Sequence, residues 1–200
     1  ANVLNALNQT GIGQRQTRML FYGGSHTAVD EWTGALRELM QRRFGDGGHG
    51  YTHLAPTFDG YMQWGVRVNA SGWTTLRPAA DRPQVDRYGL AGVMFVGGPG
   101  ATSTVSTDHT LASRVHLYFS ALDTHTSVSL TLDGRSVPLP TAAHHTGGVI
   151  AEFAVPDQPH SVSVRVTSGS ATFYGASFER DHGVIIDNLA LTGSKARHML

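Results

Sequence analysis

Cysteine is absent from the 200-residue sequence, and charged side chains make up only 15% of it. The absence of cysteine excludes a disulfide framework, a thiolate metal site and a cysteine nucleophile. Lys plus Arg and Asp plus Glu number 15 each, so no net charge is present to attract nucleic acid or an anionic membrane. No apolar run approaches the roughly 20 residues that span a bilayer, so no membrane span is expected. Ala1 opens into polar sequence without a basic and then apolar leader, so we expect an export signal to have been removed already.

Glycine, by contrast, is abundant, with 24 copies. This composition favours turn-rich β structure over a bundle of long helices. The 11 histidines show no helical or hairpin spacing with neighbouring carboxylates of the kind that binds a metal ion. We therefore expect neither a metal nor a cofactor.

The N-terminal part follows an α/β pattern. Residues 18–22 form a short apolar run without alternation, as in a strand that is buried on both faces. Thr27 and Asp30 fit a capping box at the start of a helix. Apolar residues then recur at helical spacing over residues 32–44, until glycines end the pattern. The sequence therefore predicts a strand, a tight turn and a helix.

A different pattern fills the middle of the chain. Residues 45–85 are irregular but rich in aromatics, and from about Tyr88 the hydrophobic period changes to two. Roughly eight short strands separated by turn signals predict a two-sheet antiparallel sandwich or jelly roll. The side chains expected to face inward are those of Val115, Leu117, Phe119, Val128, Leu130, Val162 and Val164.

Residues 183–189 return to a non-alternating apolar run. The simplest account is a β domain inserted into a parallel-sheet domain, with boundaries at residues 1–85, 86–181 and 182–200. The strands at 18–22 and 184–189 should then lie in one parallel sheet.

Ser25 is the main candidate for chemistry. It stands where a buried strand passes into a helix, so backbone N–H groups would face a negative charge that develops beside it. The residues around it, Gly-Gly-Ser-His-Thr, lack the second glycine of the nucleophile elbow. The alternative is a serine that merely caps a helix. A neighbour on a turn usually points away from the serine, so we expect His26 to have a structural or substrate-lining role and not to act as the base.

Two further groups invite a functional interpretation. Trp64, with Tyr61 and Trp73, could stack on sugar rings, but these aromatics could equally cover the junction between the two domains. Asp46 and His49 match the string Asp-x-x-His. These two residues lie just beyond the C-terminal end of the predicted helix, whereas Ser25 precedes its N-terminal end. A base at His49 would therefore be too far away to reach the Ser25 hydroxyl.

Two stretches resemble conserved blocks of the SGNH (GDSL-type) serine hydrolases. Residues 21–28 (FYGGSHTA), followed by 32–39 (WTGALREL) and 43–51 (RFGDGGHGY), resemble block I of the GDSH-containing branch, which includes peptidoglycan O-acetylesterases. Residues 183–193 (GVIIDNLALTG) resemble block II. Some members carry a carbohydrate-binding-like sandwich between these blocks. The resemblance implies a three-layer α/β fold with a parallel sheet, incomplete in this chain, and an inserted β-sandwich.

The resemblance also assigns roles. Ser25 would be the nucleophile and would donate its own N–H to the oxyanion, and Gly193 would donate a second N–H. The chain departs from the family at Gly24, where relatives have Asp, and at Ala190, where they often have Gly. Block III, with an oxyanion-hole Asn, and block V, with the Asp-x-x-His that supplies the base, do not occur. A serine without a base is a weak nucleophile, so we expect a second polypeptide to supply the missing blocks.

The resemblance therefore implies a serine ester hydrolase that removes acyl groups, acetyl above all, from an O-acylated glycan. The setting would be the bacterial periplasm or the extracellular space. The alternative is a catalytically degenerate module that binds a glycan or a protein, in which Gly24 and the missing blocks record lost activity.

Overall fold

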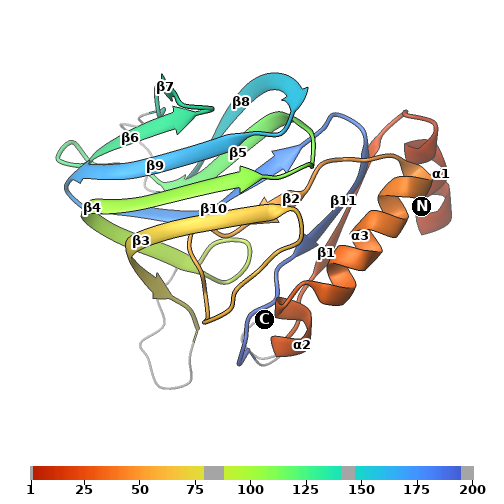
Figure 1. Cartoon of the computed structure of the whole chain (residues 1–200), viewed down its shortest axis with the longest axis horizontal. Helices are drawn as coiled ribbons and strands as arrows, with labels where there is room; N and C mark the ends of the chain where they lie inside the picture. The colour runs from red at the N-terminus through yellow and green to blue at the C-terminus, as the bar shows by residue number, and fades with distance from the viewer. Residues whose placement is uncertain (1, 79–87, 141–146, 195–200) are drawn as a thin grey trace.

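The computed structural model describes residues 2–78, 88–140 and 147–194 (Figure 1). A nine-stranded antiparallel sheet lies on one side of a two-stranded parallel sheet, and helices α1 and α3 cover the other side of that pair (Figure 1). The helices are α1 (Val3–Gly11), α2 (Ser25–Ala28) and α3 (Glu31–Phe44). The strands are β1 (Gln16–Phe21), β2 (Gly50–Thr52), β3 (Val66–Leu76), β4 (Met94–Thr107), β5 (Ala112–Ser120), β6 (Ser127–Leu132), β7 (Arg135–Val137), β8 (Gly148–Gln158), β9 (Ser161–Ser168), β10 (Ala171–Glu179) and β11 (Gly183–Asn188). None of the helices in these ranges is long and apolar enough to cross a membrane.

Strands β1 and β11 pair in parallel, with Gln16 opposite Gly183 and Phe21 opposite Asn188. This confirms the prediction that two strands at opposite ends of the sequence share a sheet. Strand β11 is buried along its whole length, as a strand covered on both faces should be. Strand β1 is not, because Leu20 is 43% exposed, and the prediction of two covered faces is wrong for this strand.

Helix α3 covers one face of this pair. It ends at Phe44 as predicted, and Gly45 follows with a φ of 95° that favours glycine. Its apolar side chains pack with Leu7 of α1 and with Val184 and Ile186 of β11. The predicted capping box is wrong: α3 begins after Asp30, whose φ is 57° and whose side chain caps no backbone N–H of this helix.

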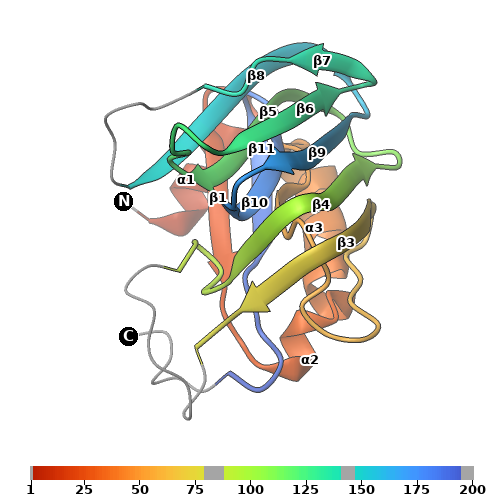
Figure 2. The ribbon, with the colours of Figure 1, turned by 90° about the vertical axis from the view of Figure 1, so that its left-hand side faces the viewer.

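The larger sheet follows the order β7-β6-β9-β4-β10-β5-β8, with β3 also paired to β4 and β2 also paired to β10. It curls around its own core, as the view in Figure 2 shows. Six of the seven side chains predicted to face inward are buried, and Val128 is partly buried against the same core. The period-two pattern therefore identified the buried face correctly.

The predicted fold class is wrong. The protein is mostly β, and within the described ranges only two strands are parallel, too few for the middle layer of a three-layer α/β fold. The β region is also one hydrogen-bonded sheet and not two stacked sheets. Strands β2 and β3, which belong to this sheet, arise from residues 45–85, where no regular structure was predicted. The division at residues 85 and 181 stays a prediction, and its last six residues lie outside the described ranges.

The two sheets meet through charged and polar groups, of which the carboxylates of Glu179 and Asp187 are buried. Arg18 of β1 pairs with Glu179 of β10 and, at 3.0 Å between Nε and Oδ2, with Asp187 of β11. Burial disfavours ionised Glu179, but hydrogen bonds from His116 and Ser177 and the Arg18 guanidinium hold its pKa at about 2. The hydrogen bond to Glu179 raises the pKa of His116, although burial opposes this. The larger sheet is thus fixed to the parallel pair by charge as well as by packing.

Candidate functional site

Ser25 lies on a tight turn directly after β1. It is the first residue of α2 and is exposed to solvent. A side chain at Gly23 is excluded, because an added Cβ would lie 2.5 Å from Thr27 Oγ1. Gly24 is different, because a Cβ there would meet no atom within 4 Å and its φ of −91° suits any residue. The turn therefore needs glycine at 23 but would accept the family's Asp at 24.

The turn that contains Gly193 is hydrogen-bonded to the Ser25 turn. The Gly23 carbonyl accepts from Leu191 N at 3.0 Å and from Ser194 Oγ at 2.9 Å. Gly193 itself is exposed and has a φ of 76°, in the left-handed region. The segments that carry the two proposed oxyanion donors are therefore adjacent, while a hole shared by their N–H groups stays a prediction.

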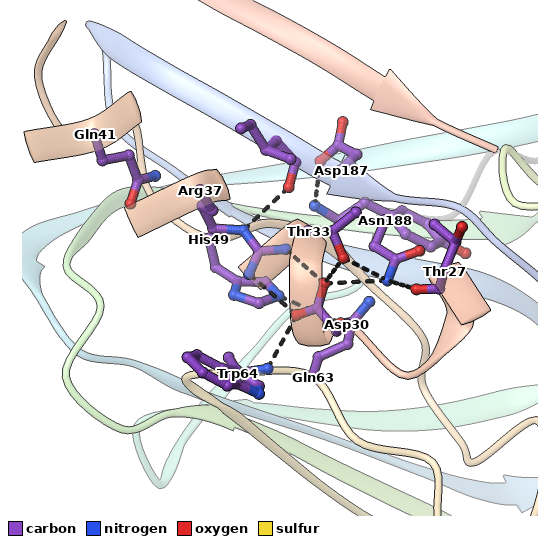
Figure 3. Close-up of polar contacts among 12 residues, drawn as sticks. Thr27, Asp30, Thr33, Arg37, Gln41, His49, Gln63, Trp64, Asp187 and Asn188 are labelled. Carbon is purple, nitrogen blue, oxygen red and sulfur yellow. Dashed lines mark hydrogen bonds and ion pairs between the residues drawn. The ribbon is translucent and has the colours of Figure 1, made fainter. Parts of the chain in front are cut away.

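Asp30 is the centre of a buried hydrogen-bond network (Figure 3). Its Oδ1 accepts from Thr33 Oγ1 at 2.6 Å and from Arg37 Nη2 at 3.2 Å. Its Oδ2 accepts from Arg37 Nη1 at 3.1 Å and from Trp64 N at 3.0 Å. Burial opposes ionisation, but Arg37 and Thr33 lower the pKa of Asp30 below its usual value. One carboxylate thus connects α3, through Thr33 and Arg37, to the backbone of the loop at Trp64.

Asn188 extends this network to β11 (Figure 3). Its Nδ2 donates to the Thr27 carbonyl at 2.7 Å and to Asp30 Oδ1 at 3.1 Å, while its Oδ1 accepts from Ala190 N at 3.1 Å. One side chain therefore positions both α2, which begins at Ser25, and the segment that leads to Gly193. Asn188 is not among the predicted site residues, although an amide at the end of an otherwise apolar strand indicates a side chain with a hydrogen-bond partner.

The other predicted site residues fall in different places. His26 is exposed on α2, and its part in substrate binding stays a prediction. Trp64 is 47% exposed, and its ring packs so closely on Gly34 that an added Cβ would lie 3.1 Å away. Trp64 thus lies beside the Asp30 network, with one part of its ring open to solvent.

His49 does not face Ser25. It is fully buried, and its Nε2 lies 3.3 Å from Gln63 Oε1. Burial and the nearby Arg37 guanidinium lower its pKa to about 3, so the ring is neutral at physiological pH. The Asp46–His49 string therefore supports the fold and supplies no base to Ser25.

Chemically, the site offers the exposed hydroxyl of Ser25, with the turn that carries Gly193 beside it. Within the described ranges, no His, Asp or Glu side chain hydrogen-bonds to Ser25. Among those same residues, no group of three or more His, Cys, Asp or Glu side chains could hold a metal ion. Such an arrangement can receive an acyl group on Ser25 but needs a base from elsewhere for turnover.

Comparison with known proteins rests on structure alone. No protein-family model matches the sequence, and no curated protein matches it. Among solved structures, a peptidoglycan O-acetylesterase matches with a TM-score of 0.70 and 24% identity, over 96% of this chain and 52% of that one. This chain thus shares the fold of about half of that esterase. Two further matches are more remote. A two-domain esterase active on acetylated mannans has a TM-score of 0.38 and 15% identity, over 57% of this chain and 34% of that one. A carbohydrate-binding module in complex with β-1,4-galactotriose has a TM-score of 0.36 and 14% identity, over 64% of this chain and 91% of that one.

Proposed function

We propose that this chain supplies the nucleophile and part of the oxyanion hole of an SGNH-type serine ester hydrolase. The substrate would be an O-acylated glycan of the cell envelope or the extracellular space, with acetyl as the main acyl group. The observation that carries the proposal is the exposed Ser25 on a glycine turn after a parallel strand, hydrogen-bonded to the turn that holds Gly193. The fold shared with a peptidoglycan O-acetylesterase supports the choice of substrate class.

In the reaction, Ser25 Oγ attacks the ester carbonyl carbon, and the carbonyl oxygen becomes an oxyanion that accepts from the N–H groups of Ser25 and Gly193. A base removes the Ser25 proton and passes it to the sugar oxygen of the ester as the bond between the carbonyl carbon and that oxygen breaks. The sugar departs with a free hydroxyl, and an acyl-serine remains. Water, activated by the same base, then releases the carboxylic acid. His26 and Trp64 would line the side from which the glycan enters.

The base would come from a second polypeptide that carries an Asp-x-x-His sequence. What supports an outside base is that no His, Asp or Glu side chain of the described ranges hydrogen-bonds to Ser25. The same polypeptide would supply the oxyanion-hole Asn. The periplasm or the extracellular space is the proposed location, since that is where such glycans occur.

Site-resolved labelling with a fluorophosphonate probe tests this proposal even without the base. A preorganised oxyanion donor is worth about 100–1,000-fold, so Ser25 should label at least about 100-fold faster than an exposed control serine. Ser127 on β6 is such a control within the same molecule. Added imidazole should accelerate labelling of Ser25 more than labelling of Ser127. Equal labelling of the two serines would refute the nucleophile assignment.

A catalytically degenerate binding module is the second candidate, and Gly24 favours it because the usual carboxylate is missing from the turn. The open space at Gly24 makes this testable. Under the hydrolase proposal, Gly24→Asp leaves the fold intact and increases the labelling of Ser25. Under the binding-module proposal, the substitution leaves Ser25 as unreactive as Ser127.

A further inference from the structure

A cavity of about 480 Å³ lies outside the Ser25 turn and is walled mainly by tyrosines. Its principal lining residues are Tyr51, Tyr88, Leu90, Tyr118, Ile150 and Tyr174. The volume falls in the range of about 300–1,000 Å³ that is usual for small-molecule sites. The cavity can therefore hold a ligand much larger than water.

The cavity follows from the alternation of the curled sheet. Leu117 and Phe119 of β5 point into the core, so Tyr118 between them points to the outer face. Ile150 of β8 pairs directly with Tyr118 and shares that face. The Tyr51 hydroxyl donates to the Tyr174 carbonyl, and this contact fixes β2 beside β10. The aromatic walls are thus held by the sheet itself.

The remaining wall connects the cavity to the candidate site. Leu90 is 46% exposed, and its carbonyl accepts a hydrogen bond from the Tyr22 hydroxyl at 3.3 Å. Tyr22 lies three residues before Ser25. The next residue, Ala91, packs in one cluster with Tyr51 and Leu189, and Leu189 N donates to the Phe21 carbonyl at 2.8 Å. The cavity wall and the Ser25 turn therefore both contact the C-terminal ends of β1 and β11.

The chemistry of the lining selects its ligand. No lining side chain is charged in the part of the chain that the structure describes, so ionic ligands find no counter-charge. Tyrosine faces carry a negative quadrupole and attract C–H groups. The hydroxyls of Tyr51 and Tyr118 already bond to the Tyr174 carbonyl and to Ser177 Oγ, but a tyrosine oxygen can still accept from a ligand hydroxyl. Leu90 and Ile150 add two exposed apolar side chains that suit a methyl group. A neutral pyranose that carries an acetyl substituent has all three features.

We infer that this tyrosine cavity is a binding subsite for a neutral, acetylated sugar residue of a glycan chain that also reaches the Ser25 turn. The choice of a glycan rests on the proposed function, whereas the cavity's preference for a neutral, partly apolar ring rests on its lining. The subsite would hold the chain while a neighbouring sugar presents its ester.

The test is a titration of the chain with chitotriose, a neutral trimer of β-1,4-linked N-acetylglucosamine, followed residue by residue by NMR. Saturable shifts are expected at Tyr118, Ile150 and Leu90. Ile150→Ser should weaken binding about tenfold or more, since it removes apolar contact area. Leu39→Ser is the matched control, because Leu39 on α3 and Ile150 are both 63% exposed, and it should bind within about twofold of the parent.

Two further ligand and variant arms separate the causes. The de-N-acetylated, cationic chitosan trimer should bind at least about tenfold more weakly than chitotriose, and Tyr118→Phe should keep the affinity, because the ring does the stacking. No saturable binding of chitotriose, or equal affinity of the Ile150 and Leu39 variants, overturns the subsite. Chitotriose binding with an unreactive Ser25 would keep the subsite and refute the hydrolase, and a reactive Ser25 without chitotriose binding would do the reverse.

Discussion

Replacing Asp30 by Asn should cost this protein a large part of its stability. Asp30 is fully buried, and its two carboxylate oxygens accept from Thr33, Arg37, Trp64 and Asn188. The Asn side chain has nearly the same shape, but it has no charge and turns one oxygen into an N–H donor. That donor would face the guanidinium or the Trp64 N–H, and the Arg37 side chain, only 6% exposed, would lose its counter-charge.

Breaking a buried ion pair on one side costs about 3–5 kcal/mol, against a usual total of about 5–15 kcal/mol. For a chain of this size, each kcal/mol shifts Tm by roughly 2–4 °C, so Asp30→Asn should lower Tm by roughly 6–20 °C. The pair Arg42–Glu38 provides the control, because its side chains are 69% and 53% exposed. Glu38→Gln should cost about 0.3–0.5 kcal/mol and leave Tm within about 2 °C.

Denaturant unfolding of Asp30→Asn, of Arg37→Met and of the variant that combines them measures the three free energies of unfolding that are needed. Asp30→Asn combined with Arg37→Met removes both charges and should be less destabilised than the sum of the single changes. Two results would refute the account: an Asp30→Asn chain within about 1 kcal/mol of the parent, or strictly additive effects in the double variant. Either would mean that the network stabilises neither α3 nor the Ser25 turn through its charge.

Three further predictions concern the turn and the histidines. Gly23→Ala should destabilise the fold and slow the labelling of Ser25, whereas Gly24→Ala should change neither, as thermal melts and labelling rates would reveal. Since burial lowers the pKa of His49 to about 3, the unfolding free energy should fall as the pH drops below about 6.5, and His49→Gln should flatten that decline. The pKa of His116 is raised, so its effect on stability runs the other way with pH. Its contribution to the free energy of unfolding is complete below about pH 6.5 and is lost at higher pH. His116→Gln should therefore lower the free energy of unfolding more at pH 5.5 than at pH 8.5.

Periodicity predicted local structure well and the overall fold poorly. The alternation in residues such as Leu117 and Phe119 identified the buried face, because side chains of a strand must point to opposite faces. The same alternation cannot distinguish one curled sheet from two stacked ones, since both bury one face. The run at residues 18–22 predicts a strand with two covered faces, yet Leu20 is exposed. A short apolar run predicts a strand, but it does not show whether other elements cover both faces of that strand.

The candidate site was predictable where glycine and serine gave a local signal. The Ser25 turn and the pairing of its strand with β11 followed from short stretches of sequence. The link between Asp30 and Asn188 did not follow, because it joins residues 158 positions apart. The amide that ends an apolar strand indicates that Asn188 is hydrogen-bonded but does not identify its partner. The sequence predicts Asp30 as the partner of Thr27 in a capping box, whereas its carboxylate instead pairs with Arg37.

The parallel pairing of β1 with β11 has a consequence for the order of folding. Roughly 160 residues separate the paired strands, and closing a flexible loop of that length costs about 4–5 kcal/mol in entropy. Once β2 has paired with β10, the remaining loop shortens to roughly 35 residues, and the closure becomes about 1.4 kcal/mol, or about tenfold, easier. We therefore expect β1 to join β11 after β2 has paired with β10. The turn that carries Ser25 would then meet the turn that carries Gly193 late in folding.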